Sequence, residues 1–269
     1  MPLNPPAPAR RPRLAVHKFS SCDGCQLALL NLGEGLIDLA ERVDIVHFAE
    51  MGALDEGAAV DIALVEGSVS TPHEVERIKL VRERSKYLIA LGACATSGGI
   101  QALRNLHRAD VWTRAVYASP EHISVLDRVE ALSSHVRVDL ELWGCPVNSH
   151  QVLGALHDLL AGVGPAPSRD RLCMECKRIG KACVVVAQGI PCMGPVTQTG
   201  CGVLCPTRGR DCYGCFGPAE HPNVAALAAR FRALGLSERD IAQRFLSINN
   251  AAPEFARAAA ASDANAPHG

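Results

Sequence analysis

The sequence is poor in aromatic residues and in unbalanced charge. Phe, Trp and Tyr together make up 4% of the 269 residues, and the formal net charge at pH 7 is −1. A protein that binds nucleic acid usually presents a basic surface, often with aromatic side chains on which bases stack. The composition therefore favours neither a nucleic-acid partner nor a charged membrane surface.

Long apolar runs are also missing. A membrane-spanning helix needs roughly 20 consecutive apolar residues, and no run here approaches that length. The first apolar stretch, Leu14–Phe19, contains His17 and Lys18 and is too short for a signal-peptide core. No apolar segment follows Arg10-Arg11 to support a twin-arginine signal. We therefore expect no membrane span and a cytoplasmic location, with residues 1–12 as a disordered tail.

Several catalytic motifs are absent as well. The sequence has no Walker A loop, no Gly-x-Gly-x-x-Gly loop and no Gly-x-Ser-x-Gly elbow. Its ten histidines show neither the HExxH nor the CxxCH spacing. We therefore expect no nucleotide site and no hydrolase site in this chain.

Cysteine, in contrast, is abundant, with twelve residues. Disulfides are disfavoured in a reducing compartment, and a chain of this length can bury a core without them. Metal ligation or redox chemistry is the leading interpretation of such a count.

The cysteines fall into two groups that also divide the chain. A sparse group consists of Cys22, Cys25, Cys94 and Cys145. A dense group consists of Cys173, Cys176, Cys183, Cys192, Cys201, Cys205, Cys212 and Cys215. The Gly- and Pro-rich segment 162–167 between them is typical of a linker. We predict domains at 13–164 and 165–258, with a frayed tail at 259–269.

The first domain alternates between strand and helix patterns. The expected strands are Leu14–Phe19, Val43–Phe48, Ile62–Glu66, Tyr87–Leu91 and Val136–Trp143. The expected helices are Gln26–Glu41, Pro72–Arg84 and Val147–Leu160. This alternation predicts an α/β fold with a mostly parallel sheet and helices on both faces.

The sparse cysteines all follow predicted strands. Cys22 and Cys25 come after the first strand, and Cys94 and Cys145 after later ones, each beside a glycine. Ligands of open α/β sheets bind beyond the carboxyl ends of the strands, and four thiolates on a rigid rim suit a [4Fe–4S] cluster. A thioredoxin-like pair at Cys22 and Cys25 is the alternative, but it leaves the other two as unexplained buried thiols.

The dense segment lacks regular periodicity. Its apolar content is too low for it to pack by itself, so we expect metal to fold it, with eight cysteines forming two sites of four. Zinc is the main competitor, although three four-thiol sites in one chain favour an electron relay of iron–sulfur clusters. Five basic residues lie near these cysteines: Lys177, Arg178, Lys181, Arg208 and Arg210. Three roles are open for them, which are to dock a redox partner, to offset the negative charge of the clusters, or to form an ordinary solvated surface. Two helices are expected afterwards, at Asn223–Leu234 and Ser237–Phe245.

Six motifs together resemble the small subunit of [NiFe] hydrogenases. They are Ser20-Ser21-Cys22-Asp23-Gly24-Cys25-Gln26-Leu27, Val65-Glu66-Gly67-Ser68, Gly92-Ala93-Cys94-Ala95, Gly144-Cys145-Pro146, Pro191-Cys192-Met193-Gly194-Pro195-Val196-Thr197 and Cys212-Tyr213-Gly214-Cys215. The sequence is most similar in these motifs to the delta subunit of the cytoplasmic NAD(P)-linked hydrogenase and sulfhydrogenase group. The homologous 20 kDa subunit of NADH:ubiquinone oxidoreductase is a second resemblance, but it has adjacent cysteines at the first motif and no eight-cysteine extension. A zinc-stabilised binding module is the alternative from another class.

The resemblance implies a flavodoxin-like domain, a smaller irregular cysteine-rich domain with C-terminal helices, and three [4Fe–4S] clusters. It implies a proximal cluster on Cys22, Cys25, Cys94 and Cys145, with Glu66 nearby. It implies a medial cluster on Cys201, Cys205, Cys212 and Cys215, and a distal cluster on Cys173, Cys176, Cys183 and Cys192. The expected partners are a [NiFe] large subunit that performs the H2 chemistry and flavin or iron–sulfur subunits that reduce NAD(P). This chain is then the non-catalytic electron-transfer subunit of an oxidoreductase.

Two positions depart from many periplasmic relatives. Cys173 stands where those relatives have a histidine ligand, and Cys205 adds a fourth ligand where they commonly have a three-iron medial cluster. The bidirectional NAD-reducing type usually ends after the proximal cluster, so the dense cysteine group argues against that type.

Overall fold

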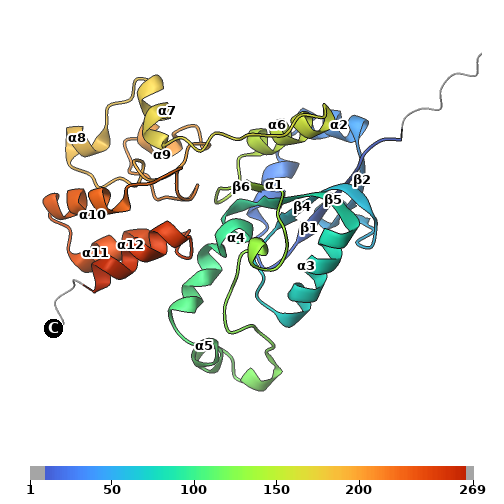
Figure 1. Ribbon diagram of the computed structural model, residues 1–269, viewed down its shortest axis with the longest axis horizontal. Helices are drawn as coiled ribbons and strands as arrows, with labels where there is room; N and C mark the ends of the chain where they lie inside the picture. The colour runs from blue at the N-terminus through green and yellow to red at the C-terminus, as the bar shows by residue number, and fades with distance from the viewer. Residues whose placement is uncertain (1–9, 265–269) are drawn as a thin grey trace, which may run out of the picture.

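The computed structural model describes residues 10–264 and folds them into two parts that lie side by side (Figure 1). The first part is built around a sheet. The second part has short helices and loops followed by three longer helices. No helix within the described range is both long and apolar enough to span a bilayer. The domain boundaries at 13–164 and 165–258 stay a prediction.

Within the described residues, six strands form one sheet in the order β3-β2-β1-β4-β5-β6. The strands are β1 Arg13–Lys18, β2 Asp44–Phe48, β3 Ala53–Leu54, β4 Val60–Glu66, β5 Ser85–Leu91 and β6 Leu140–Leu142. All pairs are parallel except the pair between β3 and β2. Leaving out the short edge strand β3, the order is that of flavodoxin-like sheets, 2-1-3-4-5. The predicted α/β fold is therefore confirmed.

Helices cover both faces of this sheet (Figure 1). They are α1 Gly24–Leu30, α2 Glu34–Arg42, α3 Pro72–Arg84, α4 Gly92–Ser97, α5 Ala109–Val116 and α6 Ser149–Leu160, with 3-10 turns η1 Ala49–Met51, η2 Gly99–Leu106, η3 Pro120–His122 and η4 Leu132–Ser134. Helices α1, α2 and α6 bury Leu29, Leu39 and Val152 against one face, and α3 buries Ile78 against the other. Parallel strands need such cover because both of their faces are apolar.

Helix α3 matches its predicted range because its start is strongly encoded. Thr71 accepts a hydrogen bond from the Glu74 backbone N–H, the Glu74 carboxylate accepts one from the Thr71 N–H, and Pro72 occupies the first turn. This reciprocal capping satisfies two N–H groups that the helix itself leaves unpaired.

Three expectations differ from the structure. The helix expected at Gln26–Glu41 is two helices, α1 and α2, because the backbone at Gly33 has a φ of 58° that a helix interior does not allow. The strand expected at Val136–Trp143 is reduced to three residues in β6. Strand β3 and the η2–α5 segment were not expected from the sequence at all.

The second part contains its own apolar core. Its helices are α7 Leu172–Arg178, α8 Val184–Gln188, α9 Leu204–Thr207, α10 Val224–Ala233, α11 Glu238–Phe245 and α12 Pro253–Asp263. Phe231, Phe245 and Phe255 are buried together with Met193 and Val203 from the cysteine-rich segment. Three C-terminal helices supply the apolar surface that the segment lacks, so the expectation that something other than an apolar core must fold it is wrong.

The two chain ends also differ from expectation where they are described. Helix α12 runs past Ala259 to Asp263, and Ala259 and Ser262 are buried, so the fraying predicted from residue 259 is wrong for that helix. Arg10 donates a hydrogen bond to Asp61, which ties the last residues of the predicted disordered tail to the sheet domain. Residues 1–9 and 265–269 lie outside the described residues.

Candidate functional site

Four cysteines meet at the carboxyl edge of the sheet, and we call them the sheet-edge quartet: Cys22, Cys25, Cys94 and Cys145. Cys22 and Cys25 follow β1, Cys94 lies in α4 directly after β5, and Cys145 follows β6. Burial raises the pKa of Cys94 to about 11, with further contributions from Cys145 and Cys22. Burial also raises the pKa of Cys25, as do the neighbouring Cys94 and Cys145. The structure thus brings all four thiols within electrostatic reach of one another.

Two glycines allow this close arrangement. Gly92 has a φ of +79°, and a Cβ added there would lie 2.4 Å from the Sγ atom of Cys25. Gly99 has a φ of +62°, and a Cβ there would lie 2.7 Å from the Sγ atom of Cys94. Any other residue would displace the sulfur atoms and would strain the backbone.

Polar groups around the sheet-edge quartet hold its loops in place. The Val147 N–H donates to the Cys25 Sγ atom at 3.4 Å, and the Cys94 thiol donates to the Gln101 side-chain oxygen at 3.3 Å. The Glu66 carboxylate, at the end of β4, accepts a hydrogen bond from the Cys25 N–H at 2.9 Å. Glu66 is 1% exposed, and burial raises its pKa. The resemblance implied a position for Glu66 near this quartet, and the structure has it there.

A second set, which we call the central quartet, consists of Cys201, Cys205, Cys212 and Cys215. Burial raises the pKa of Cys215 to about 12, and Cys201 and Cys205 add to the shift. Burial also raises the pKa of Cys212, and Cys192 of the neighbouring set and then Cys215 contribute to that shift. The Gly214 N–H donates to the Cys212 Sγ atom at 3.4 Å.

A third set, which we call the outer quartet, consists of Cys173, Cys176, Cys183 and Cys192. Burial raises the pKa of Cys173 to about 11, followed by contributions from Cys192, Cys183 and Cys176. A Cβ added to Gly194 would lie 3.4 Å from the Cys192 Sγ atom and 3.5 Å from the Cys173 Sγ atom. These two sulfur atoms therefore both lie against the same glycine.

The three quartets adjoin in a fixed order. Cys145 of the sheet-edge quartet contributes to the raised pKa of Cys215 in the central quartet. The Cys212 N–H of the central quartet donates to the Cys192 Sγ atom of the outer quartet at 3.2 Å. The central quartet thus lies between the other two, and α7 and α8 of the outer quartet lie at the far side of the second part from the sheet (Figure 1).

The donor set fits iron–sulfur chemistry. None of the twelve cysteines forms a disulfide, so all twelve thiols are available as ligands, and thiols release their protons when they bind a metal centre. Across residues 10–264, no group of three or more His, Cys, Asp or Glu is arranged to hold a metal ion. A four-iron cluster is a larger body than one ion, and its four thiolate ligands surround it from further apart.

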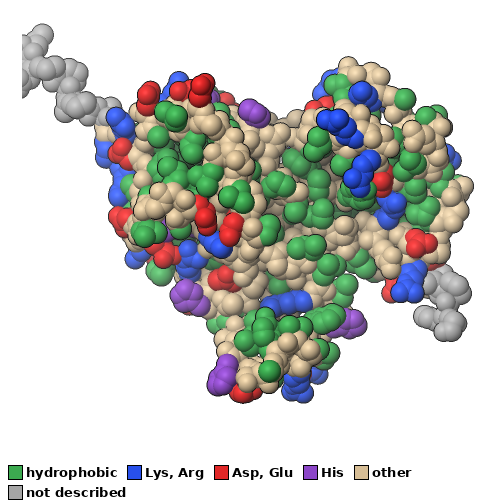
Figure 2. All heavy atoms as spheres, turned by 180° about the vertical axis from the view of Figure 1, so that it is seen from behind, with side chains coloured by type: hydrophobic (Ala, Val, Ile, Leu, Met, Phe, Trp, Pro, Cys, Tyr) green, Lys and Arg blue, Asp and Glu red, His purple; other side chains and the backbone are tan. Residues whose placement is uncertain are grey.

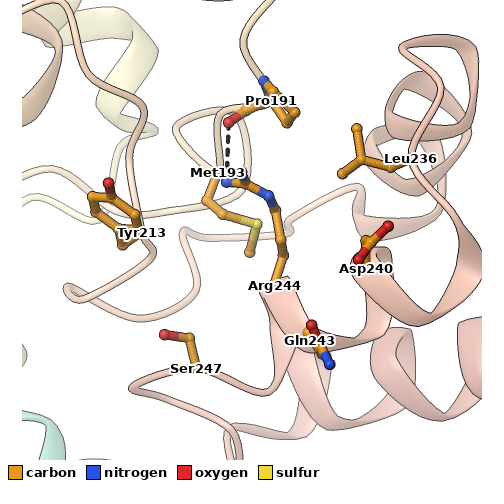
Figure 3. Close-up of a pocket in the computed structure, with 8 residues that line it drawn as sticks. All are labelled: Pro191, Met193, Tyr213, Leu236, Asp240, Gln243, Arg244 and Ser247. Atoms are coloured by element: carbon orange, nitrogen blue, oxygen red, sulfur yellow. Dashed lines mark hydrogen bonds between the residues drawn. The ribbon is translucent and has the colours of Figure 1, made fainter.

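One pocket adjoins the central and outer quartets (Figure 3). It has a volume of about 460 Å³ and is lined by Pro191, Met193, Tyr213, Leu236, Asp240, Gln243, Arg244 and Ser247. The Arg244 guanidinium donates to the Pro191 carbonyl oxygen at 3.1 Å and also binds the Asp211 carboxylate. Helix α11 thereby fixes the chain beside both Cys192 and Cys212.

A basic surface covers the outer end of the molecule. We define it as Lys177, Arg178, Lys181, Arg208 and Arg210, all of which are exposed. In the part of the chain that the structure describes, Arg178 pairs with Asp170, whereas Lys177, Lys181 and Arg208 form no ion pair. Lys and Arg side chains gather over the α7 and α9 part of the molecule (Figure 2).

Sequence reasoning missed the residues that hold the cysteine loops. Gln101, Asn148, Arg244 and Asn249 hydrogen-bond to a cysteine thiol or to the backbone beside one. They lie outside the cysteine motifs, and three of the four bond across 34 or more residues of sequence, so no local pattern could identify them.

Comparison with known proteins gives consistent matches. The family model for the NADH ubiquinone oxidoreductase 20 Kd subunit matches residues 22–159. The chain is 35% identical over 232 residues to the delta subunit of sulfhydrogenase 2 of Pyrococcus furiosus, a match that covers 86% of this chain and 97% of the relative. It is 31% identical over 258 residues to a subunit of the vhu F420-non-reducing hydrogenase of Methanococcus voltae, covering 84% of this chain and 90% of the relative.

A solved structure is also similar. A chain from the crystal structure of an NAD+-reducing [NiFe]-hydrogenase in the H2-reduced state superposes with a TM-score of 0.54 and 30% identity. The match covers 96% of that chain but only 59% of this one. The present chain therefore carries a substantial region with no counterpart there.

Proposed function

Because the chain belongs to the NADH ubiquinone oxidoreductase 20 kDa subunit family and is a hydrogenase subunit within it, we propose that it is the electron-transfer small subunit of a [NiFe] hydrogenase. The observation that supports a relay is the order of the three cysteine quartets. The central quartet adjoins the sheet-edge quartet at Cys145 and Cys215, and the outer quartet at Cys212 and Cys192.

Each quartet would hold one [4Fe–4S] cluster. Bound there, the clusters would supply one-electron carriers between an H2-activating large subunit and an NAD(P)-linked partner. The sheet-edge quartet corresponds to the proximal cluster, the central quartet to the medial cluster and the outer quartet to the distal cluster. Cys173 would complete the distal ligand set and Cys205 the medial one, so all ligands would be thiolates.

The protein's own residues would adjust these sites without doing bond chemistry. Backbone N–H groups of Val147, Cys212 and Gly214 donate to sulfur atoms, which stabilises negative charge on the thiolates. Burial of Cys25 and Cys212 keeps water from their sulfur atoms, and burial is one of the factors that set a cluster's reduction potential.

The large subunit would cover the apolar surface near the sheet-edge quartet. Ile100 follows Gly99, which contacts Cys94, and it is 58% exposed; Leu27, beside Cys25, is also exposed. Apolar side chains are also visible on the projecting α5 region (Figure 2). Exposed apolar patches of this kind mark protein interfaces.

The basic surface at the outer end would face the NAD(P)-linked flavin or iron–sulfur subunits. Its cations lie beside Cys176, Cys183 and Cys205, close to where electrons would leave or enter. We also propose a cytoplasmic location, because twelve unpaired thiols are kept reduced there.

Iron and labile-sulfide analysis of the full chain, purified anaerobically, tests this function. We expect about twelve irons per chain. Replacing one ligand per quartet, as in C94A, C215A and C192A, should remove about four irons each. Met174→Ala, an exposed change next to Cys173, serves as the control and should retain them all. Stoichiometric zinc without broad visible absorption would overturn the proposal.

A further inference from the structure

Two adjacent asparagines are buried in the turn between α11 and α12. Asn249 is 1% exposed and Asn250 is 4% exposed. Asparagine is mostly found at protein surfaces, and a buried amide without partners costs about 1–3 kcal/mol. Both side-chain amides have hydrogen-bond partners here.

Asn249 joins the first part of the molecule to the central quartet. Its side-chain oxygen accepts a hydrogen bond from the Ser97 hydroxyl of α4 at 2.8 Å. Its Nδ2 atom donates to the Gly214 carbonyl oxygen at 2.8 Å and to the Cys215 carbonyl oxygen at 3.1 Å. One side chain therefore connects the helix that carries Cys94 with the loop that carries Cys215.

Asn250 holds the backbone just past the same end of α4. Its Nδ2 atom donates to the Gly99 carbonyl oxygen at 3.0 Å and to the Ser247 carbonyl oxygen at 3.0 Å. Gly99 is the residue whose backbone packs against the Cys94 sulfur. Asn250 thus fixes the turn that limits where this sulfur can lie.

The local turn does not require these side chains. It is closed by a backbone hydrogen bond from the Ala252 N–H to the Asn249 carbonyl oxygen, which any residue at position 249 could form. Four of the five side-chain bonds instead reach segments between 34 and 152 residues away. Asn249 and Asn250 serve contacts between distant segments.

We propose that Asn249 and Asn250 are positioning residues that fix the separation and orientation of the sheet-edge and central quartets. This inference rests on the proposed function, because the spacing matters only if both quartets hold clusters. An amide suits the task because it donates and accepts without adding charge. An aspartate at the same place would put a buried negative charge near thiolate-ligated clusters.

The test uses the full chain purified anaerobically, with N249A and N250A compared with the wild type. We expect about twelve irons in each, because no ligand is removed. With all clusters reduced, the spin–spin splitting between the proximal and medial clusters in the electron paramagnetic resonance spectrum should be lost or changed in N249A and weakened in N250A. Electron equilibration between them should slow relative to the wild type.

Asn223→Ala is the matched control. Asn223 caps α10 by accepting from the Ala226 N–H and contacts no cysteine loop, so this variant loses an asparagine and some stability but should keep the wild-type splitting. If N249A fails to fold, S97A removes the α4 end of the contact, together with the hydrogen bond from the Ser97 hydroxyl to the Ala93 carbonyl oxygen within α4, and should still alter the splitting.

Each outcome decides a separate point. A wild-type splitting in N249A, or in S97A where N249A does not fold, overturns the inference and leaves the proposed function intact. A wild-type chain without iron overturns the proposed function itself. A control that changes as much as N249A shows that general destabilisation accounts for the effect, which also overturns the inference.

Discussion

The sharpest test of the sheet-edge quartet is the substitution Gly92→Ala. It adds one methyl group at the start of α4, and that Cβ would lie 2.4 Å from the Cys25 sulfur and 3.2 Å from the Gly144 carbonyl oxygen. Ordinary contacts between such atoms begin near ~3.5 Å. The Cys25 sulfur must therefore move by about 1 Å, whereas a metal site tolerates displacements of only about 0.5 Å.

Backbone strain has to be separated from this steric effect. The φ of Gly92 is +79°, and a left-handed conformation costs a residue with a side chain about 1–2 kcal/mol. Gly235 is the matched control, because its φ is +88° and no atom lies within 4 Å of an added Cβ. G235A therefore carries a similar strain without contact with any cysteine.

Iron analysis, together with the reduced-state paramagnetic resonance signal of the proximal cluster, distinguishes the two variants. We expect about twelve irons in G235A and about eight in G92A, with only the proximal signal lost. If G92A retained as much iron as G235A and the same proximal signal, the assignment of Cys25 to this site would be refuted.

Three further predictions follow from other parts of the chain. Burial, followed by the charges of His47 and Arg77, lowers the pKa of His17 from 6.5 to about 3. Between these two pH values the native state binds fewer protons at His17 than the unfolded state does. The contribution of His17 to the unfolding free energy therefore falls as the pH falls below 6.5. Because burial also lowers the pKa of His47, anaerobic urea unfolding should show a pH dependence in both proteins that is smaller in His17→Gln by about 1.4 kcal/mol per pH unit. Exchanging Lys177 and Lys181 for glutamate should slow electron transfer to the NAD(P)-linked partner, with a weaker dependence on salt in stopped-flow measurements but unchanged iron content. Phe255→Ala, in the core of the second part, should cost about 3–5 kcal/mol in the unfolding free energy and lower the iron content of the central and outer quartets first.

The sequence predicted those features that depend on local patterns. Strand β4 contains the apolar run 62–65 and α3 begins with a complete capping motif, so both appear close to their expected places. The grouping of Cys22, Cys25, Cys94 and Cys145 followed from a general rule, since residues after parallel strands meet at one edge of the sheet. Cys22 and Cys94 thus interact although 72 positions separate them.

Features that depend on long-range packing could not be predicted in this way. The break at Gly33 needs a left-handed conformation that the helical pattern does not reveal. Helix α12 is rich in alanine and resembles a weak tail in sequence, yet Phe255 and Ala259 are buried in the core of the second part. The contact between Asn249 and Ser97 joins residues 152 positions apart, and no feature of the isolated motif Asn249-Asn250 distinguishes it from a polar surface turn.

The apolar core of the second part gives the cysteine-rich segment a source of folding free energy other than metal binding. A segment folded only by metal would unfold when its clusters are lost. Here Met193 and Val203 from the cysteine-rich segment pack against Phe231 and Phe245 of the C-terminal helices, and Arg244 binds the loops next to Cys192 and Cys212. The C-terminal helices therefore supply apolar and polar contacts that order the cysteine loops in addition to any ordering that bound clusters would supply.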